Sequence, residues 1–118
     1  MNRRELIDYC LTYPDAYEDY PFHDSPDIAG AWTVMRHGLN KKGFAFIYER
    51  GGLRVNLKSE PERGDFLRQV YSGVKPAYHM NKNHWITVCV NSDVPVEVLH
   101  GMIDRSYKLT MNKNKRGK

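Results

Sequence analysis

One short stretch of the sequence, residues 78–85, gathers side chains that could take part in chemistry. It reads YHMNKNHW and holds two histidines, two asparagines, a lysine, a tyrosine and a tryptophan. Lysine contacts phosphate groups, asparagine and histidine hydrogen-bond to phosphate or to base edges, and aromatic rings stack on unpaired bases. The same residues also suit a structural role, because Trp85 begins a strand-like run and His79 and Asn81 can satisfy backbone groups of a loop.

Basic residues outside this stretch would enlarge a binding surface. Lys75 lies just before it, and in the run LRVNLK (53–58) every second residue is polar or basic. Because side chains alternate between the two faces of a strand, this pattern places Arg54 and Lys58 on the same sheet surface. We interpret the whole set as a binding surface rather than an active site. The candidate nucleic-acid-binding residues are Arg54, Lys58, Lys75, His79, Asn81, Lys82 and His84.

Other kinds of site find little support in the sequence. A zinc site needs three or four converging ligands, whereas His79 and His84 stand five residues apart with no cysteine or carboxylate at ligand spacing. A second loose group, His23, Asp24 and Asp27, is equally unspecific. The sequence contains no Gly-x-Ser-x-Gly elbow, glycine-rich phosphate loop or dinucleotide-binding motif. We therefore expect no enzyme activity, no catalytic residues, no metal site and no cofactor.

Charge is unevenly distributed along the chain. Residues 1–30 carry seven acidic side chains against two arginines, a net charge of −5, so the rest of the chain carries +9 and the whole chain +4. From Arg105 onward there are six basic residues and no acidic one. Such asymmetry favours a surface that attracts polyanions. The alternative is a basic tail that serves solubility alone.

The two cysteines, Cys10 and Cys89, match no metal or redox spacing. Both fall among apolar residues, so we interpret them as buried free thiols. The charged start of the chain is followed by no apolar leader segment, and no apolar run approaches the roughly 18 residues of a membrane span. We expect a soluble, cytoplasmic protein without membrane contacts.

The first helix is predicted from a capping box. Asn2 followed by Glu5 is typical of a helix start, and apolar residues then recur at helical spacing. Pro14 disfavours helical geometry in the residue before it, so the helix should end near Tyr13. The next segment, PDAYEDYPFHDSPD (14–27), holds three prolines and five acids and predicts an ordered loop.

Four strand-like runs follow, at residues 31–37, 44–49, 53–57 and 84–90, with a glycine pair between the second and third that favours a hairpin. A helix is predicted from about Glu60 to Tyr71, then a loop from Lys75, and a last helix from Pro95 to Leu109. The apolar stripes of these two helices should be Phe66, Leu67, Val70 and Tyr71 in the first, and Val96, Leu99, Met102, Ile103 and Tyr107 in the second.

The resulting order, α-β-β-β-α-β-α, predicts an α+β domain of two layers. Strands joined by short turns pair antiparallel, and amphipathic helices cover a sheet face. We therefore expect an antiparallel sheet with helices on one face, in a single domain over residues 1–110. Residues 111–118 should form a basic, flexible tail.

Four segments resemble the MmcQ/YjbR-like family of small bacterial proteins. They are PDAYEDYPF (14–22), RVNLKSEPE (54–62), YSGVKPAYHMNKNHWITV (71–88) and MIDRSYKL (102–109). The similarity runs from Arg3 to about Leu109, and YHMNKNHW is its most specific part. The matching signature positions are Pro14, Glu18, Asp19, Pro21, Phe22, Asn56, Lys58, Gly73, Tyr78, His79, Met80, Asn81, Lys82, His84 and Trp85.

This resemblance implies an α+β fold similar to CyaY, the bacterial frataxin, and to secretion chaperones. It also implies DNA binding, a label that rests on the likeness of this architecture to a double-wing DNA-binding arrangement, and fold alone does not fix function. The resemblance supplies no catalytic residues. Our leading hypothesis is therefore a non-enzymatic DNA-binding protein that contacts phosphates and binds more weakly as salt rises.

Two alternatives stay open. The first is a module that binds a small ligand or a protein in the manner of a chaperone, as a monomer or a dimer. The second is a weak, frataxin-like binder of a hard cation, which would use carboxylate oxygens. The carboxylates concerned are Asp15, Glu18, Asp19, Asp24 and Asp27.

Overall fold

The computed structural model describes residues 1–21 and 31–111 and confirms the predicted α+β class. Every predicted helix and strand is present, and two further short strands occur. Residues 112–118 of the predicted tail lie outside the described part of the chain. The elements are α1 (Arg3–Cys10), β1 (Ala16–Asp19), β2 (Thr33–His37), β3 (Gly43–Glu49), β4 (Leu53–Lys58), α2 (Pro61–Val70), β5 (Val74–Pro76), β6 (Trp85–Cys89) and α3 (Val96–Thr110).

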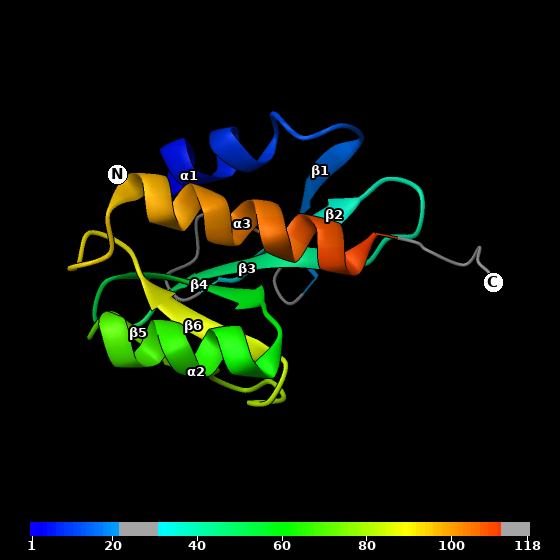
Figure 1. Ribbon diagram of the computed structural model, residues 1–118. Coiled ribbons are helices and arrows are strands. Elements are labelled where there is room, and N and C mark those ends of the chain that lie inside the picture. The colour runs from blue at the N-terminus through cyan, green and yellow to red at the C-terminus, as the bar shows by residue number, and fades with distance from the viewer. Residues whose placement is uncertain (22–30, 112–118) are drawn as a thin grey trace, which may run out of the picture.

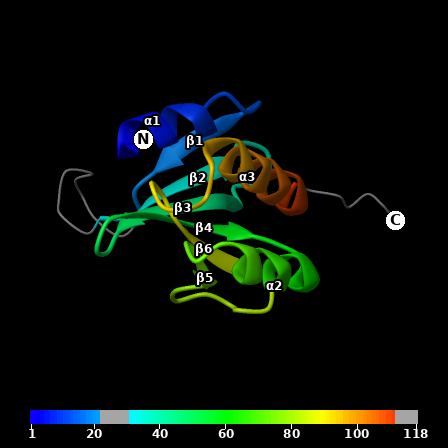
Figure 2. The same ribbon diagram turned by 60° about the vertical axis from the view of Figure 1, so that its left-hand side comes forward.

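The six strands form one antiparallel sheet in the order β1-β2-β3-β4-β6-β5. Figure 2 shows them running from β1 at the top to β5 at the bottom. After β4 the chain forms α2 and adds β5 at the edge of the sheet. It then returns as β6, which lies between β4 and β5. In the β4–β6 pair, Arg54 lies opposite Cys89 and Lys58 lies opposite Trp85.

All three helices contribute to one apolar core, which confirms the prediction that they cover one face of the sheet. Figure 1 shows α3 lying across β3 and β4, and α2 lying beside β5 and β6. Val55 and Leu57 of β4 belong to this core, so the residues that alternate with them point to the other side. We call that other side the open face. The helix residues of the core are Leu6, Ile7, Cys10, Leu67, Leu99, Met102, Ile103 and Tyr107.

The start of α1 matches its sequence signal. The Asn2 side chain accepts a hydrogen bond from the Glu5 N–H (2.8 Å), and the Glu5 carboxylate accepts one from the Asn2 N–H (2.8 Å), which completes the capping box. The helix ends at Cys10, earlier than the predicted Tyr13, because Leu11 already serves as its C-cap.

Two segments predicted as loops contain strands instead. β1 lies within the predicted loop 14–27 and pairs with β2, and β5 lies at the start of the predicted loop before β6. They are four and three residues long, too short to show an alternating pattern in the sequence. Each is a strand because it extends an existing edge of the sheet. Residues 22–30, which complete the predicted acidic loop, lie outside the described residues.

The predicted apolar stripe of α2 is wrong in part. Leu67 is buried, but Phe66 and Val70 are 58% and 49% exposed. The helix approaches the sheet through its small residue, since a Cβ added at Gly64 would lie 3.1 Å from the Ile86 side chain. This close approach turns the neighbouring apolar residues outward.

In α3 the four later residues of the predicted stripe are buried, whereas Val96 is 47% exposed at the first turn. The prediction of two buried thiols is correct for Cys10 and wrong for Cys89, which is half-buried on the open face opposite Arg54. Burial raises the pKa of the Cys10 thiol to about 12. Within the described ranges, no helix is long and apolar enough to cross a membrane.

Candidate functional site

A buried asparagine organises the open face of the sheet. Asn56 in β4 is fully buried, and its side-chain oxygen accepts hydrogen bonds from the hydroxyls of Tyr48 (2.9 Å) and Thr87 (2.6 Å). Its side-chain nitrogen donates to the Tyr78 carbonyl (2.8 Å), while the Tyr78 N–H donates to the Thr87 hydroxyl oxygen (3.0 Å). These four bonds hold the beginning of the 77–84 loop against β4 and β6.

The protonation of Tyr48 supports this network. Burial raises the pKa of its phenol, and the Thr87 hydroxyl together with the positive charges of Arg54 and Arg50 opposes that rise. A phenol is already protonated at neutral pH with its ordinary pKa of 10.0, and the upward shift of the Tyr48 pKa leaves it so. It can therefore act as a hydrogen-bond donor to Asn56, which leaves the amide nitrogen of Asn56 for the loop.

An aromatic cluster lies above the same network. The Trp32 ring stacks on Tyr48 with centroids 4.2 Å apart. The ring centroids of Tyr78 and Tyr48 are 5.7 Å apart, with 29° between the ring planes. The Arg50 guanidinium carbon lies 4.2 Å from the centre of the Tyr78 ring, and the His79 ring lies 4.0 Å from it. Stacking of a guanidinium on an aromatic face holds Arg50 in place without neutralising its charge.

Beside Tyr78 lies a hollow of about 420 Å³ that we call the basic pocket. Arg50 and Arg54 approach each other there because Gly51 and Gly52 both adopt positive φ (65° and 122°) in the predicted hairpin turn. Lys75 comes from β5, where it pairs with Thr87 of β6. The charged and aromatic lining residues are Arg50, Arg54, Lys75, Tyr78, His79 and Lys82.

The loop that carries the YHMNKNHW motif supplies one edge of the basic pocket. His79 adopts a positive φ of 60°, a conformation that costs energy for a residue other than glycine. In the described structure, the N–H groups of His79 to Lys82 donate to no protein acceptor. Consecutive free N–H groups beside basic side chains favour anions.

The structure brings together four of the seven predicted binding residues, namely Arg54, Lys75, His79 and Lys82, and places the other three elsewhere. Lys58 lies at the far end of β4, about 13 Å along the strand from Arg54, with its ammonium 5.9 Å from the Trp85 ring centre. Trp85, which could have been a core residue, is half-buried on the open face.

Asn81 and His84 have local roles in the loop. The Asn81 side chain accepts a hydrogen bond from the Asn83 N–H (2.8 Å), which closes a turn. The His84 carbonyl accepts one from the Ser59 N–H (2.9 Å), so its position follows the end of β4. Both side chains are exposed away from the residues that line the basic pocket.

The charges of the basic pocket lack the partners that other basic residues have. No carboxylate from the described residues lines the hollow, and none forms an ion pair with Arg50, Arg54, Lys75 or Lys82. Like charges held close together repel, so an anion in the hollow would relieve that repulsion. Basic residues that do pair with carboxylates are Arg3, Arg4, Arg36, Arg68, Arg105 and Lys108.

Two important residues were missed in the sequence. Arg50 flanks the predicted glycine turn. Tyr48 lies opposite Arg54 in the hairpin, and side chains two residues apart on a strand share a face, so the place of Arg50 beside Arg54 was foreseeable. Asn56 belongs to the family signature and was considered only as a polar group of the sheet surface, whereas it is fully buried. Its place between Val55 and Leu57 indicated only a polar sheet face, and the sequence held no sign that a loop would cover it.

Two acidic residues of the cation-binding hypothesis, Glu18 and Asp19, are neighbours in β1 and therefore point to opposite faces of the sheet. Glu18 accepts from Arg4 (2.9 Å), which lowers the pKa of its carboxyl, and the neighbouring Asp19 pairs with Arg36 (2.7 Å) on the opposite face. His23, Asp24 and Asp27 lie outside the described residues. Within the described ranges, no three His, Cys, Asp or Glu side chains are grouped so that they could hold a metal ion.

Comparison with known proteins places this site in a family. The YjbR family model matches residues 11–109, nearly the whole described chain. The chain belongs to the YjbR family. The Escherichia coli protein YjbR is 30% identical over 95% of this chain and 89% of its own length, and YyaQ of Bacillus subtilis is 34% identical over 93% of this chain and 98% of its own length.

Solved structures of the YjbR type share the fold. A crystal structure of a Pseudomonas syringae protein superposes with a TM-score of 0.81 at 35% identity, covering 94% of this chain and 100% of that one. A Deinococcus radiodurans protein gives a TM-score of 0.79 at 33% identity, covering 96% of this chain and 80% of its own. A shared fold does not determine the ligand, which depends on the chemistry of the site.

Proposed function

We propose that this YjbR-family protein is a non-enzymatic binding protein that holds DNA by its phosphates in the basic pocket. The observation that carries the proposal is the convergence of four cationic side chains on one hollow without a carboxylate partner among the described residues. Lysine and arginine are the side chains that contact nucleic-acid phosphates most often.

The support beneath the basic pocket fits a binding role. Arg54 lies in β4 and Lys75 in β5, and both strands pair with β6. The Tyr78 backbone is fixed to Asn56 and Thr87 by hydrogen bonds of 2.8 and 3.0 Å. A rigid base of this kind lowers the conformational entropy that binding would cost. The proposal includes no reading of base sequence, since phosphate contacts position a protein on DNA without carrying sequence information.

Salt dependence provides the first test. If four cations each neutralise one phosphate, the logarithm of the affinity should fall with a slope of about −3.6 against the logarithm of the salt concentration, a loss of roughly 150-fold between about 50 and 200 mM. We would measure this by fluorescence anisotropy with a labelled duplex of arbitrary sequence. The experiment needs the chain both whole and shortened after Met111, so that the basic terminal residues are counted separately.

Matched variants locate the binding. Replacing Lys75 and Lys82 together with alanine should reduce the salt slope by about 1.8 and weaken binding on every sequence. The control changes two exposed basic residues of the helices, Arg63 and Lys108, in the same way. Equal losses in both variants, or loss of binding only on removing the terminal residues, would show that the basic pocket is not the DNA site.

Lys58 offers a second comparison, because the sequence predicted it as a phosphate contact and the structure separates it from the basic pocket. Lys58→Glu and Lys82→Glu make the same change of charge at two places on the open face. We expect the larger loss of affinity from Lys82→Glu. Equal losses would extend the DNA surface along the whole of β4.

A further inference from the structure

The shape of the basic pocket, in addition to its charge, indicates which kind of ligand would fit it. A DNA duplex carries one negative charge for about every 1.7 Å of its axis, so a surface that follows a duplex should spread its cations in a row. Here four cations and His79 surround one hollow of about 420 Å³. That volume falls in the range of pockets that enclose small ligands, roughly 300–1,000 Å³.

The rest of the open face does not continue this cluster as a row of free charges. Among the described residues, Arg36 is the basic residue of β2 on this face, and it is paired with Asp19 at 2.7 Å. Lys58 lies about 13 Å from Arg54 along β4 and its ammonium is placed over Trp85. Among the described residues of the open face, the positive charges without a carboxylate partner are therefore densest at the basic pocket, with Lys58 apart from them.

A phosphomonoester matches such a cluster better than a phosphodiester. A monoester carries a charge of about −1.5 to −2 at neutral pH and three acceptor oxygens, whereas each phosphate inside a strand carries one charge. Arg50 and Arg54 can each donate through a planar fork, while Lys75 comes from β5 and Lys82 from the 77–84 loop. His79 and Lys82 line the hollow, and among the described residues their N–H groups have no protein acceptor, so they are available as further donors at the loop edge.

We infer that the basic pocket binds a phosphomonoester group, with the 5′-phosphorylated end of a nucleic-acid strand as its source. The choice of a strand as the source rests on the proposed function, while the phosphomonoester chemistry is shared with free mononucleotides. Tyr78 lines the hollow, and the centroid of the Trp32 ring lies 6.3 Å from that of Tyr78, so a nucleoside joined to the bound phosphate would meet an aromatic side chain.

The test compares ligands that differ in one phosphate. Binding of a short single-stranded oligonucleotide with a 5′-phosphate would be measured against the same strand with a 5′-hydroxyl, and against a nucleoside 5′-monophosphate by calorimetry. We expect the 5′-phosphate to tighten binding by about tenfold or more, the size of one good charge-assisted hydrogen bond. The Lys75→Ala, Lys82→Ala variant should lose this preference, and the Arg63→Ala, Lys108→Ala control should keep it.

The outcomes separate this inference from the proposed function. Equal binding of the two oligonucleotides would overturn the inference and leave phosphate-backbone binding standing. Failure of both oligonucleotides to bind would overturn the strand as source, and failure of the labelled duplex to bind as well would overturn the proposed function. A mononucleotide that binds as tightly as the phosphorylated strand would uphold the phosphomonoester and overturn the strand as its source.

Discussion

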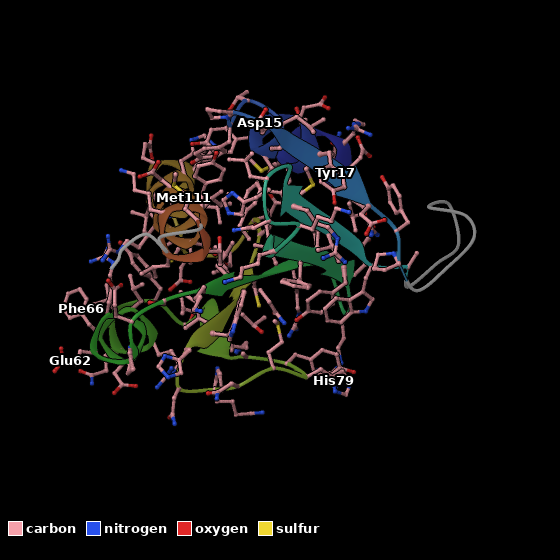
Figure 3. The ribbon with its side chains drawn as sticks, turned by 90° about the vertical axis from the view of Figure 1, so that its right-hand side faces the viewer. Asp15, Tyr17, Glu62, Phe66, His79 and Met111 are labelled. Carbon is pink, nitrogen blue, oxygen red and sulfur yellow. The ribbon has the colours of Figure 1, made fainter. Side chains whose placement is uncertain are left out.

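The basic pocket and the groove between α2 and α3 both gather charged side chains, but the groove mixes acidic with basic residues and the described lining of the basic pocket holds no acidic one. The groove, a hollow of about 690 Å³, is lined by three acidic and three basic residues with Phe66 among them. In Figure 3, Phe66 and Glu62 project from α2 on one side of the molecule and His79 lies on the other. Arg105 pairs with Glu60, and Lys108 pairs with Asp104 at 3.0 Å.

The difference suggests what each region is for. In the helix groove, two of the three basic residues are neutralised by carboxylates, and the Arg105–Glu60 pair links α3 to the start of α2. In the basic pocket, like charges are held together by strands and hydrogen bonds that do not neutralise them. Size alone would favour the groove, which is larger. The basic pocket is favoured as the binding site because its charges have no carboxylate partners among the described residues.

The largest effect should come from the buried support of the basic pocket. Asn56→Ala leaves the Tyr48 hydroxyl, the Thr87 hydroxyl and the Tyr78 carbonyl without their partner. At about 1 kcal/mol or more for each, the free energy of unfolding should fall by about 3 kcal/mol or more. Urea denaturation would measure this change.

Asn83→Ala is the matched control for Asn56, because its exposed side chain has no described partner and only its backbone N–H is used. We expect a change within about 0.5 kcal/mol for this variant. If Asn56→Ala cost less than about 1 kcal/mol, the buried network would not be what holds the 77–84 loop, and the contrast with the helix groove would weaken.

Two glycines, one near each region, should respond in opposite directions. A Cβ at Gly73 would lie 2.1 Å from Ser92 Oγ and 2.9 Å from Asp93 Oδ1, the carboxylate that accepts hydrogen bonds from the Ser72 and Gly73 N–H groups. Gly73→Ala should therefore destabilise the fold by about 1–3 kcal/mol. A Cβ at Gly101, in α3 beside the groove, meets nothing within 4 Å.

Gly101→Ala should stabilise the protein by about 0.8–1 kcal/mol, because alanine has the higher helix propensity. Thermal unfolding of the two variants would measure both signs. Destabilisation by Gly101→Ala would contradict the open space beside α3 and would indicate that something occupies the groove.

These positions also show how far sequence reasoning reached. The strong periodic segments gave the right elements, and alternation in LRVNLK correctly placed Arg54 and Lys58 away from the core. Alternation gives the face of a side chain and not its distance from others, so Lys58 was grouped with residues that lie far along the strand. The pairing of Lys75 with Thr87 needed β5, which is too short to leave a pattern.

The outward turn of Phe66 had a different cause. Hydrophobicity at helical spacing favoured its burial, but the close packing of Gly64 against Ile86 fixes the rotation of α2 about its axis. A glycine in a helix indicates such a contact only once the partner strand is known. At the site and in the core alike, the residues that could not be predicted are those whose positions depend on which distant strands pair and in which register.

Removing charges should affect stability in one region and not in the other. Arg105→Ala breaks the ion pair with Glu60 and should cost up to about 1 kcal/mol, since both side chains are partly exposed to solvent. The Lys75→Ala, Lys82→Ala variant should unfold at the same urea concentration as the parent or slightly higher, because it removes mutual repulsion. A clear loss of stability in that variant would mean that the pocket cations have structural partners.

The smallest expected effect is a pH dependence confined to the helix groove. The hydrogen bond from Arg105 lowers the pKa of Glu60 from its usual value of 4.5. Because the folded pKa is the lower one, this carboxylate contributes stability above pH 4.5, and the contribution is lost as the pH falls through the lowered pKa. The contribution should be a few tenths of a kcal/mol at most, since the pair is exposed and screened.

Glu60→Gln isolates this contribution from that of the other carboxylates. Thermal melts at closely spaced pH values between about 3 and 6 should show a shallower loss of stability for Glu60→Gln than for the parent. The Lys75→Ala, Lys82→Ala variant should follow the parent over this range, since no carboxylate of the described residues lines the basic pocket. Parallel curves for Glu60→Gln and the parent would mean that the Glu60–Arg105 pair adds nothing to stability. The charges of the groove would then be as available for binding a ligand as those of the basic pocket.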